Sequence, residues 1–171
     1  LDWVHFQNEL NRQVLTVDNL PKGQYALSID ARKVGEYSSA ELKIGIELSA
    51  NPATPQYNQS LRVKALQDQQ LKATSKLRTI ALVRHSMIKK IKPAVSEKDH
   101  AALTIALATY LNKSKGKSWY KYLRQQADAY LETVQKEDEY KHQEVQWMQK
   151  IWQQNQPTRH RWQLKKIPSG S

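Results

Sequence analysis

Apolar and polar side chains alternate along residues 24–30, so that one face of an extended chain would hold Tyr25, Leu27 and Ile29. A period of two is typical of a β-strand that buries one face and exposes the other. A turn is favoured just before this run, because Pro21 fixes its own φ and Gly23 tolerates a positive φ. Residues 13–17 and 33–37 are expected to be its antiparallel partners. The pattern therefore predicts a small β-meander.

Residues 38–43, SSAELK, follow with the pattern of a short helical turn capped by Ser39. The next segment, GIELSANPATP, contains two prolines, which end regular structure. We place the clearest internal boundary of the chain here.

Residues 56–91 contain neither Gly nor Pro and repeat apolar side chains at helical spacing, which predicts one long amphipathic helix. The apolar positions are Leu66, Ala73, Leu77, Ile80, Met87 and Ile91. Pro93 ends this helix. Ser96, with Asp99 three residues later, favours the cap of a second helix over residues 96–112.

A third helix is predicted over residues 119–154, after a loop rich in Lys, Ser and Gly. Its apolar stripe would consist of Leu123, Ala127, Leu131, Val134, Val145, Met148 and Trp152. Pro157 ends it, and residues 159–165 then alternate again as a strand. An isolated strand would leave its backbone groups unpaired. We therefore expect it to return to the meander, where Trp162 and Leu164 would join the cluster of Tyr25, Leu27 and Ile29.

Together these elements predict an α+β fold, in which a small antiparallel β-meander with a returning C-terminal strand accompanies a long helical hairpin or bundle. We assign residues 1–50 to a β cap, 51–156 to a helical arm, and 157–171 to the returning strand and tail. The three segments are expected to form one structural unit, as a fragment of a larger protein. With 171 residues, the chain has room for one domain rather than two.

Positive charge is concentrated in the second part of the chain. Residues 1–60 contain five Lys and Arg against seven Asp and Glu, whereas residues 61–171 contain 22 against nine. This imbalance favours an anionic partner, which could be nucleic acid, anionic lipid or an acidic protein surface. No apolar run is long enough to cross a bilayer, so a soluble chain is expected. The absence of Cys excludes disulfides, thiolate metal sites and a Cys nucleophile.

Candidate catalytic and metal-binding residues are weak. No Gly-x-Ser-x-Gly or Gly-Asp-Ser motif occurs, so we expect no serine nucleophile. The pairs Glu97/His100 and Glu139/His142 have the spacing that di-iron helical bundles use, but the helix predicted over residues 56–91 contains no Glu to complete such a site. We interpret them as surface pairs and expect no metal or cofactor. The remaining histidines are interpreted as ordinary packed or surface residues, at His5, His85 and His160.

The stretch NKSKGKSWYKYLR is the best local candidate for nucleic-acid or other anion binding, because it places aromatic rings among cations. The candidate contacts are Lys113, Lys115, Lys117, Trp119, Lys121 and Arg124. The competing interpretation is that Trp119 and Tyr122 begin the core stripe of the third helix while the lysines solvate a loop. We favour that second interpretation, because aromatic residues at helical spacing are more often part of a core.

Residues 10–49, LNRQVLTVDNLPKGQYALSIDARKVGEYSSAELKIGIELS, resemble a segment that follows the catalytic α/β core in bacterial GDSL-type (SGNH) hydrolases. The matching residues are Asn11, Arg12, Gln13, Leu20, Pro21, Gly23, Tyr25, Leu27, Ile29, Asp30, Val34, Gly35, Glu41, Leu42, Gly45 and Leu48. NPATPQ and QPTRHRWQL also resemble the C-terminal end of that family, where a helical insertion separates the two.

This resemblance implies that the nucleophile block, the oxyanion residues and the terminal Asp-x-x-His motif would lie upstream of Leu1, so it assigns no catalytic residue here. We expect a non-catalytic C-terminal cap or lid of an esterase-like hydrolase, whose partner is its own upstream core and whose junction includes Trp3 and Phe6. The resemblance is compatible with an extracytoplasmic location. Two alternatives are a free-standing basic helical module that binds nucleic acid or another anionic surface, and a helical metalloprotein.

Overall fold

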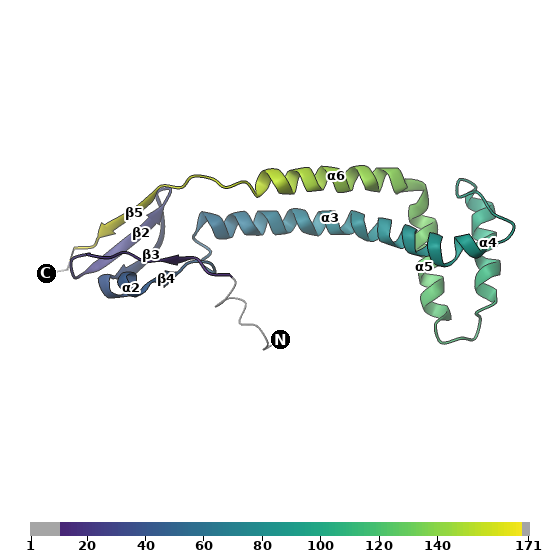
Figure 1. Cartoon of the computed structure of the whole chain (residues 1–171), viewed down its shortest axis with the longest axis horizontal. Coiled ribbons are helices and arrows are strands. Elements are labelled where there is room, and N and C mark those ends of the chain that lie inside the picture. The colour runs from purple at the N-terminus through teal and green to yellow at the C-terminus, as the bar shows by residue number, and fades with distance from the viewer. Residues whose placement is uncertain (1–10, 169–171) are drawn as a thin grey trace. The chain divides into compact units, whose positions relative to one another are not determined.

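The computed structural model describes residues 11–168 (Figure 1). The predictions for Trp3, His5 and Phe6 lie outside this range. The chain divides into two compact units, one formed by residues up to Lys64 together with residues from Gln153 onward, and the other by residues 65–152. The secondary structure is α+β, as the sequence predicts. None of the helices in the described part of the chain has the length and hydropathy of a membrane span.

Strand β2 (Gln24–Ile29) is the central strand of the first unit. It pairs antiparallel with β3 (Arg32–Ser38) on one side and with β5 (Trp162–Lys166) on the other (Figure 1). Leu164 lies opposite Leu27 in this register. The prediction that the C-terminal strand returns to the first sheet is therefore confirmed.

The prediction for residues 13–17 is wrong. Strand β1 (Val14–Leu15) pairs with β4 (Ile46–Glu47) in a separate two-stranded sheet. The position beside β2 that was predicted for residues 13–17 is taken by β5. The backbone N–H of Gln13 donates to Glu47 Oε1 at 2.8 Å, and the N–H of Leu48 donates to the Gln13 carbonyl at 2.9 Å. These bonds fix β1 against β4.

Helix α2 (Ser39–Ile44) begins one residue earlier than the predicted cap implies, because Ser38 is the N-cap. Ser38 Oγ accepts a hydrogen bond from the N–H of Glu41, and the Glu41 carboxylate accepts one from the N–H of Ser38. This reciprocal capping box satisfies two backbone donors at the helix start. It directs Leu42 into the core of the first unit.

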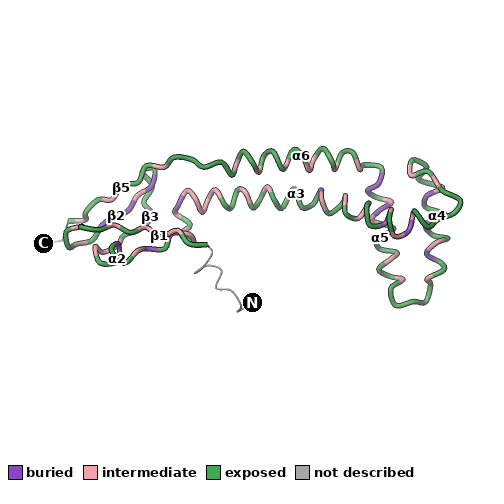
Figure 2. The backbone as a smooth tube through the Cα atoms, in the orientation of Figure 1, coloured by how far each residue is buried: buried purple, intermediate pink, exposed green. Residues whose placement is uncertain are grey.

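The core of the first unit is formed by Tyr25, Leu27, Ile29, Val34, Leu42, Ile46 and Leu48 (Figure 2). Leu164 packs against this cluster, as predicted. Trp162 does not join it, because 40% of Trp162 is exposed although the residue lies opposite Ile29. The alternating pattern therefore predicted the strand β5 correctly, but it wrongly assigned Trp162 to the core.

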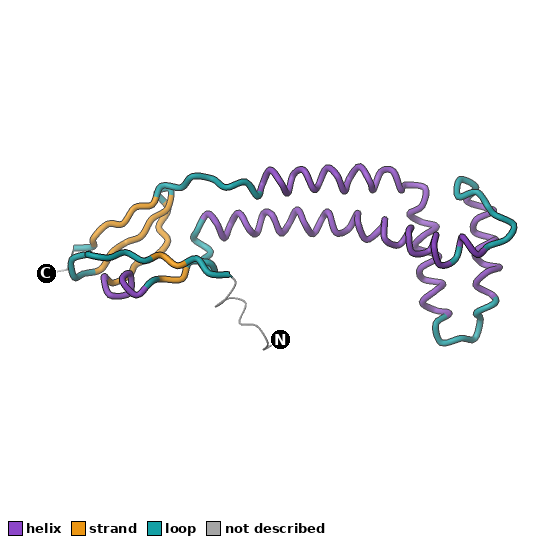
Figure 3. The backbone as a smooth tube through the Cα atoms, in the orientation of Figure 1, coloured by secondary structure: helices purple, strands orange, loops and turns teal. Residues whose placement is uncertain are grey.

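The second unit is helical. Its elements are α3 (Pro55–Ser86, whose first turns belong to the first unit), the short 3₁₀ turn η1 (Ile88–Lys90), α4 (His100–Asn112), α5 (Tyr120–Thr133), the 3₁₀ turn η2 (Val134–Lys136) and α6 (Glu137–Gln154) (Figure 3). Helix α4 begins at its cap Asp99, whose side chain accepts from the N–H of Ala102, rather than at Ser96 as predicted.

The single helix predicted over residues 119–154 is wrong, because the chain turns at η2 between α5 and α6 (Figures 1 and 3). Val134 is buried at this corner. Beyond it, the residues predicted to continue the apolar stripe are exposed; they are Val145, Met148 and Trp152. The partly buried apolar residues of α6 are instead Tyr140, Trp147 and Ile151, since the turn changes the face that the helix presents.

The core of the second unit brings α3, α4 and α5 together. It consists of Ile80, Val83, Met87, Leu103, Leu107, Leu111, Ala127, Tyr130 and Val134. Helix α6 runs beside α3, and Thr74 Oγ1 on α3 donates to Glu144 Oε1 on α6 at 2.8 Å (Figure 1). A side-chain hydrogen bond therefore joins the two helices within the second unit.

Replacing Leu27 by Ala should reduce the free energy of unfolding by about 2–5 kcal/mol, because a fully buried leucine leaves a cavity. Trp162→Ala should cost less, about 2 kcal/mol, since 40% of the residue is already in water. Urea unfolding, with amide exchange measured at residues 25–29, compares the two. An equal loss of protection in both variants would show that Trp162 belongs to the core after all.

Candidate functional site

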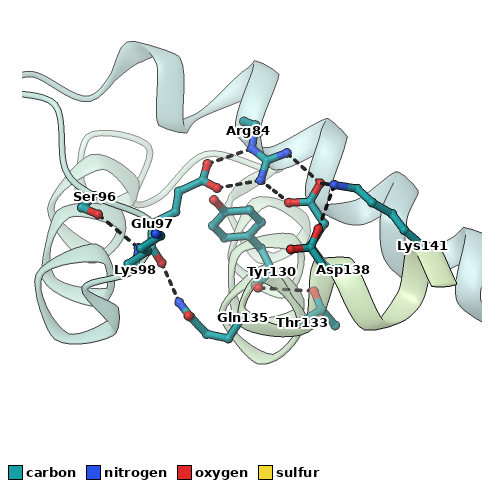
Figure 4. Close-up of polar contacts among 10 residues, drawn as sticks. Arg84, Ser96, Glu97, Lys98, Tyr130, Thr133, Gln135, Asp138 and Lys141 are labelled. Atoms are coloured by element: carbon teal, nitrogen blue, oxygen red, sulfur yellow. Dashed lines mark hydrogen bonds and ion pairs between the residues drawn. The ribbon is translucent and has the colours of Figure 1, made fainter. Parts of the chain in front are cut away.

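Arg84, near the end of α3, joins two carboxylates that are distant in sequence (Figure 4). Its Nε and Nη2 atoms donate to the two oxygens of Glu97 at 2.8 and 2.6 Å. Its Nη1 and Nη2 atoms donate to those of Glu137 at 3.3 and 2.6 Å. Glu97 lies in the segment before α4, and Glu137 is the first residue of α6. We call the segment between these two acids, residues 97–137 with α4 and α5, the helical turnaround. One guanidinium therefore connects α3 to both ends of the helical turnaround.

Further polar contacts support this ion cluster. Lys141 Nζ lies 3.0 Å from Glu137 Oε1 and 3.2 Å from Asp138 Oδ1, and the Gln135 side chain donates to the Glu97 carbonyl (Figure 4). The Tyr130 ring is buried, and its hydroxyl points toward Glu97 without a well-formed hydrogen bond to a described residue (Figure 4). The cluster is thus polar at its rim and closed on its inner side by an aromatic ring.

The guanidinium keeps both acids ionised. Hydrogen bonds from Arg84 lower the pKa of Glu137 from its ordinary value of 4.5 to about 2, and they also lower the pKa of Glu97. The two carboxylates raise the pKa of Arg84. Burial raises the pKa of the Tyr130 hydroxyl. None of these groups changes its protonation state near neutral pH, so the cluster fits a structural clamp and does not fit general acid–base catalysis, which needs a pKa near the working pH.

The two Glu-x-x-His pairs do not form a site together. Glu97 is engaged by Arg84, Glu139 accepts from Gln143 Nε2 at 3.0 Å, and His142 Nδ1 lies 2.6 Å from the carbonyl of Asp138. In the part of the chain that the structure describes, no three His, Asp or Glu side chains gather as a metal site.

The interpretation that Trp119 and Tyr122 begin a core stripe is wrong, because each is 53% exposed. The residues of this stretch that pack against the core of the second unit are Tyr120 and Leu123. The exposed rings lie at the start of α5, directly after a loop that presents Lys113, Lys115 and Lys117 to solvent. The arrangement that the basic-aromatic hypothesis requires, rings and ammonium groups both accessible, is present.

Lys121 and Arg124 lie in a different electrostatic environment. They line a cavity of about 520 Å³ along α5 together with Asp128 and Glu132. Arg124 Nε is 3.7 Å from Asp128 Oδ2, and the hydrogen bond with Tyr120 and the charge of Asp128 raise the pKa of Arg124. The six predicted contact residues therefore do not share one uniformly cationic surface.

A hydrogen-bonded chain in the first unit was not predicted from the sequence. His160 Nδ1 lies 2.6 Å from Asp30 Oδ2, and His160 Nε2 lies 2.9 Å from Thr158 Oγ1. The order hydroxyl, imidazole and carboxylate is that of a nucleophile, its base and the residue that orients the base. The signal in the sequence was the spacing of Thr158 and His160 in an extended segment, which places both on one face.

The geometry around Asp30 favours a structural role for this chain. Asp30 and Ala31 have φ values of 51° and 64° and form the two-residue turn between β2 and β3, as in the primed hairpin turns. Asp30 Oδ1 accepts from the N–H of Arg161 at 2.8 Å, and the Asp30 N–H donates to the Arg161 carbonyl at 2.9 Å. The bond from the Arg161 N–H and the hydrogen bond with His160 lower the pKa of the Asp30 carboxyl, and the two bonds to Arg161 hold the start of β5 to the turn. We call these residues, Asp30, Thr158, His160 and Arg161, the β5 clip.

Comparison with known proteins gives one similar solved structure and no sequence family. No family model and no curated protein matches the chain. A gut microbial diltiazem-metabolizing enzyme is similar, with a TM-score of 0.76 and 26% sequence identity. The similarity covers 96% of this chain and 36% of that protein. The chain thus spans about a third of the length of the enzyme that it resembles in structure.

Arg84→Met should reduce the free energy of unfolding by about 1–3 kcal/mol, because it leaves two carboxylates facing each other without their shared cation. The loss is smaller than for a fully buried pair, since a third of the Arg84 side chain is exposed. Arg124→Met, which breaks an exposed pair, is the matched control and should change the free energy of unfolding much less than Arg84→Met. Urea unfolding with amide exchange at Leu103 and Leu107 measures both. Equal effects of the two substitutions would contradict the clamp.

The pH dependence of this difference follows from the lowered pKa of Glu137. An acid whose pKa is lower in the folded chain contributes stability above its ordinary pKa, and that contribution disappears as the pH falls through the folded value. The difference in stability between the natural chain and Arg84→Met should therefore be constant above about pH 5 and shrink between pH 4.5 and 2. A difference that does not change across this range would contradict the assignment.

Proposed function

We propose that this chain is the non-catalytic C-terminal portion of an ester hydrolase of the SGNH type. The observation that carries the proposal is the structural similarity over 96% of the chain to about a third of a larger enzyme. The resemblance of residues 10–49 to the segment that follows an SGNH core supports the same conclusion independently.

The described residues are suited to supporting such a core. The first unit is a small sheet with a closed apolar cluster, and its most triad-like side chains are used to hold β5 to the β2–β3 turn. The second unit is a helical arm whose turnaround is clamped by Arg84. In this proposal the first unit is a cap on the upstream catalytic core, and the arm is a lid or accessory element.

The isolated chain should not hydrolyse p-nitrophenyl acetate above the rate of buffer. A hydroxyl, imidazole and carboxylate in line still need donors that stabilise the oxyanion and a pocket for the acyl group. Thr158→Val, which removes the only hydroxyl of the β5 clip, is the informative variant and should leave the rate unchanged. Turnover that disappears in Thr158→Val would overturn the non-catalytic assignment and make the clip an active site.

The open reading frame that encodes this chain gives a second test of the proposal. A Gly-Asp-Ser block and a later Asp-x-x-His motif encoded before Leu1 are expected. A frame that encodes an unrelated domain there would remove the hydrolase proposal.

A second candidate function is binding of nucleic acid or another anionic surface by the helical arm, and the exposure of Trp119 and Tyr122 favours it. Rings at the surface can stack on bases while lysines contact phosphates. Single-stranded DNA should bind weakly, and its affinity should fall steeply as the salt concentration rises, because counterion release is the main driving force of this binding. Trp119→Ala should weaken binding several-fold at constant charge, with Trp147→Ala as control. A salt-independent complex, or no effect of Trp119→Ala, would contradict this mode of binding.

A further inference from the structure

A small cavity lies between the segment that follows α3 and the second half of α4. Its volume is about 210 Å³, and its lining consists of Lys90, Ile91, Lys92, Pro93, Val95, Ala106, Thr109, Tyr110 and Lys113. Pockets that enclose a whole drug-sized ligand measure roughly 300–1,000 Å³. This one is large enough only for a short apolar group, such as the end of an alkyl chain.

The floor of the cavity is apolar and well supported. Ile91, Val95 and Tyr110 are partly buried and pack against the core of the second unit. The Tyr110 hydroxyl also donates to the Ser86 carbonyl at 3.4 Å, which ties the ring to the end of α3. A floor held by the core on one side and open on the other can accept an apolar group without rearranging.

The rim of the cavity is cationic. Lys90, Lys92 and Lys113 reach it from both of its walls, and no acidic residue contributes to its lining. Among the described residues, none of these three ammonium groups has a hydrogen bond or ion pair. The larger cavity along α5 differs in this respect, because Asp128 and Glu132 balance its cations.

The surrounding sequence strengthens the positive potential at this rim. Residues 85–127 contain nine Lys and Arg against two acidic residues, Glu97 and Asp99. Glu97 is already neutralised by Arg84, and Asp99 caps α4. Neither carboxylate is therefore available to pair with the three lysines.

We propose that this cavity binds an amphiphilic anion, with an aliphatic chain on the apolar floor and a carboxylate or phosphate head between Lys90, Lys92 and Lys113. The proposal goes beyond both functions proposed above and depends on neither. Charge complementarity sets the head group, and the volume limits the chain to a few carbons in contact with the floor. Nucleic acid fits this site less well, because the one aromatic ring in its lining, Tyr110, is partly buried against the core and is tied to the Ser86 carbonyl through its hydroxyl.

Isothermal titration of the chain with acetate, hexanoate, octanoate and octanol tests both parts of the ligand. Each methylene that reaches the floor should tighten binding by roughly fourfold until the cavity is full. Octanol, which lacks the charge, and acetate, which lacks the chain, should each bind at least tenfold more weakly than octanoate. Equal binding of acetate and octanoate would overturn the proposal, because the lysines would then act as an unspecific anion site.

Substitution separates this site from general positive charge. The triple variant Lys90→Gln, Lys92→Gln, Lys113→Gln should weaken octanoate binding at least tenfold. The matched control, Lys72→Gln, Lys76→Gln, Lys136→Gln, removes the same charge on α3 and η2, outside the cavity, and should change binding less than twofold. An equal loss in both variants would overturn the proposal. Ala106→Leu should fill the floor and abolish the chain-length dependence, and Thr109→Leu replaces it if circular dichroism shows that Ala106→Leu does not fold.

The anion could be free or the head of a membrane lipid, and two further arms distinguish these sources. Octyl phosphate tests a free ligand, and vesicles of phosphatidylglycerol in a flotation assay test a bilayer. Binding of either that is lost in the cavity triple variant and kept in the control supports the proposal and identifies the source. Binding of none of the three probes, octanoate, octyl phosphate and vesicles, would refute it.

Discussion

Pairing of β5 with β2 is the constraint on which the rest of the chain depends. The hydrogen bond between Asp30 and the N–H of Arg161 joins residues 131 positions apart, and everything between them must leave the sheet and return to it. Without β5, one edge of β2 would present unpaired backbone groups to solvent. The β5 clip fixes the first residues of the returning strand, and Leu164 opposite Leu27 fixes its register.

A chain that must return needs a defined turnaround, and Arg84 provides the electrostatic part of it. The same guanidinium contacts the segment before α4 and the first residue of α6, so the position of α4 and α5 is linked to that of the helix leading back. The apolar part comes from Val134 and Tyr130, which bury the corner at η2. Both parts are needed, because an ion cluster that is one-third exposed contributes less than a fully buried one.

Sequence patterns predicted those features that depend on local periodicity. The alternation around Tyr25 and Leu164 predicted two strands, and the absence of Gly and Pro over residues 56–91 predicted one long helix, of which α3 ends at Ser86 and the turn η1 follows. These patterns gave wrong predictions where contacts between residues distant in sequence decide the structure. Nothing in the local sequence distinguishes residues 13–17 as a partner of β4 rather than of β2. No Gly or Pro marks the turn at Val134, because the ion pair of Glu137 with the distant Arg84 stabilises it.

The candidate sites show the same limit. Trp119 and Tyr122 have the spacing of a core stripe, but the burial of neighbouring Tyr120 and Leu123 leaves them at the surface. Lys90, Lys92 and Lys113 converge only because the segment after α3 packs along α4. Likewise, Asp30 and His160 meet through strand pairing rather than through any motif. The sequence shows which residue types are available for these sites, but tertiary contacts decide which of the residues lie next to one another.

In the proposed function, the catalytic residues precede Leu1 and this chain forms a non-catalytic cap and helical arm. Covalent labelling of the full-length protein with a fluorophosphonate, followed by peptide mapping, tests this most directly, because the reagent modifies only an activated serine or threonine. The account predicts an adduct on one serine that precedes Leu1 and no adduct on residues 1–171. An adduct on Thr158 or on any other residue of this chain, or no adduct at all, would contradict it.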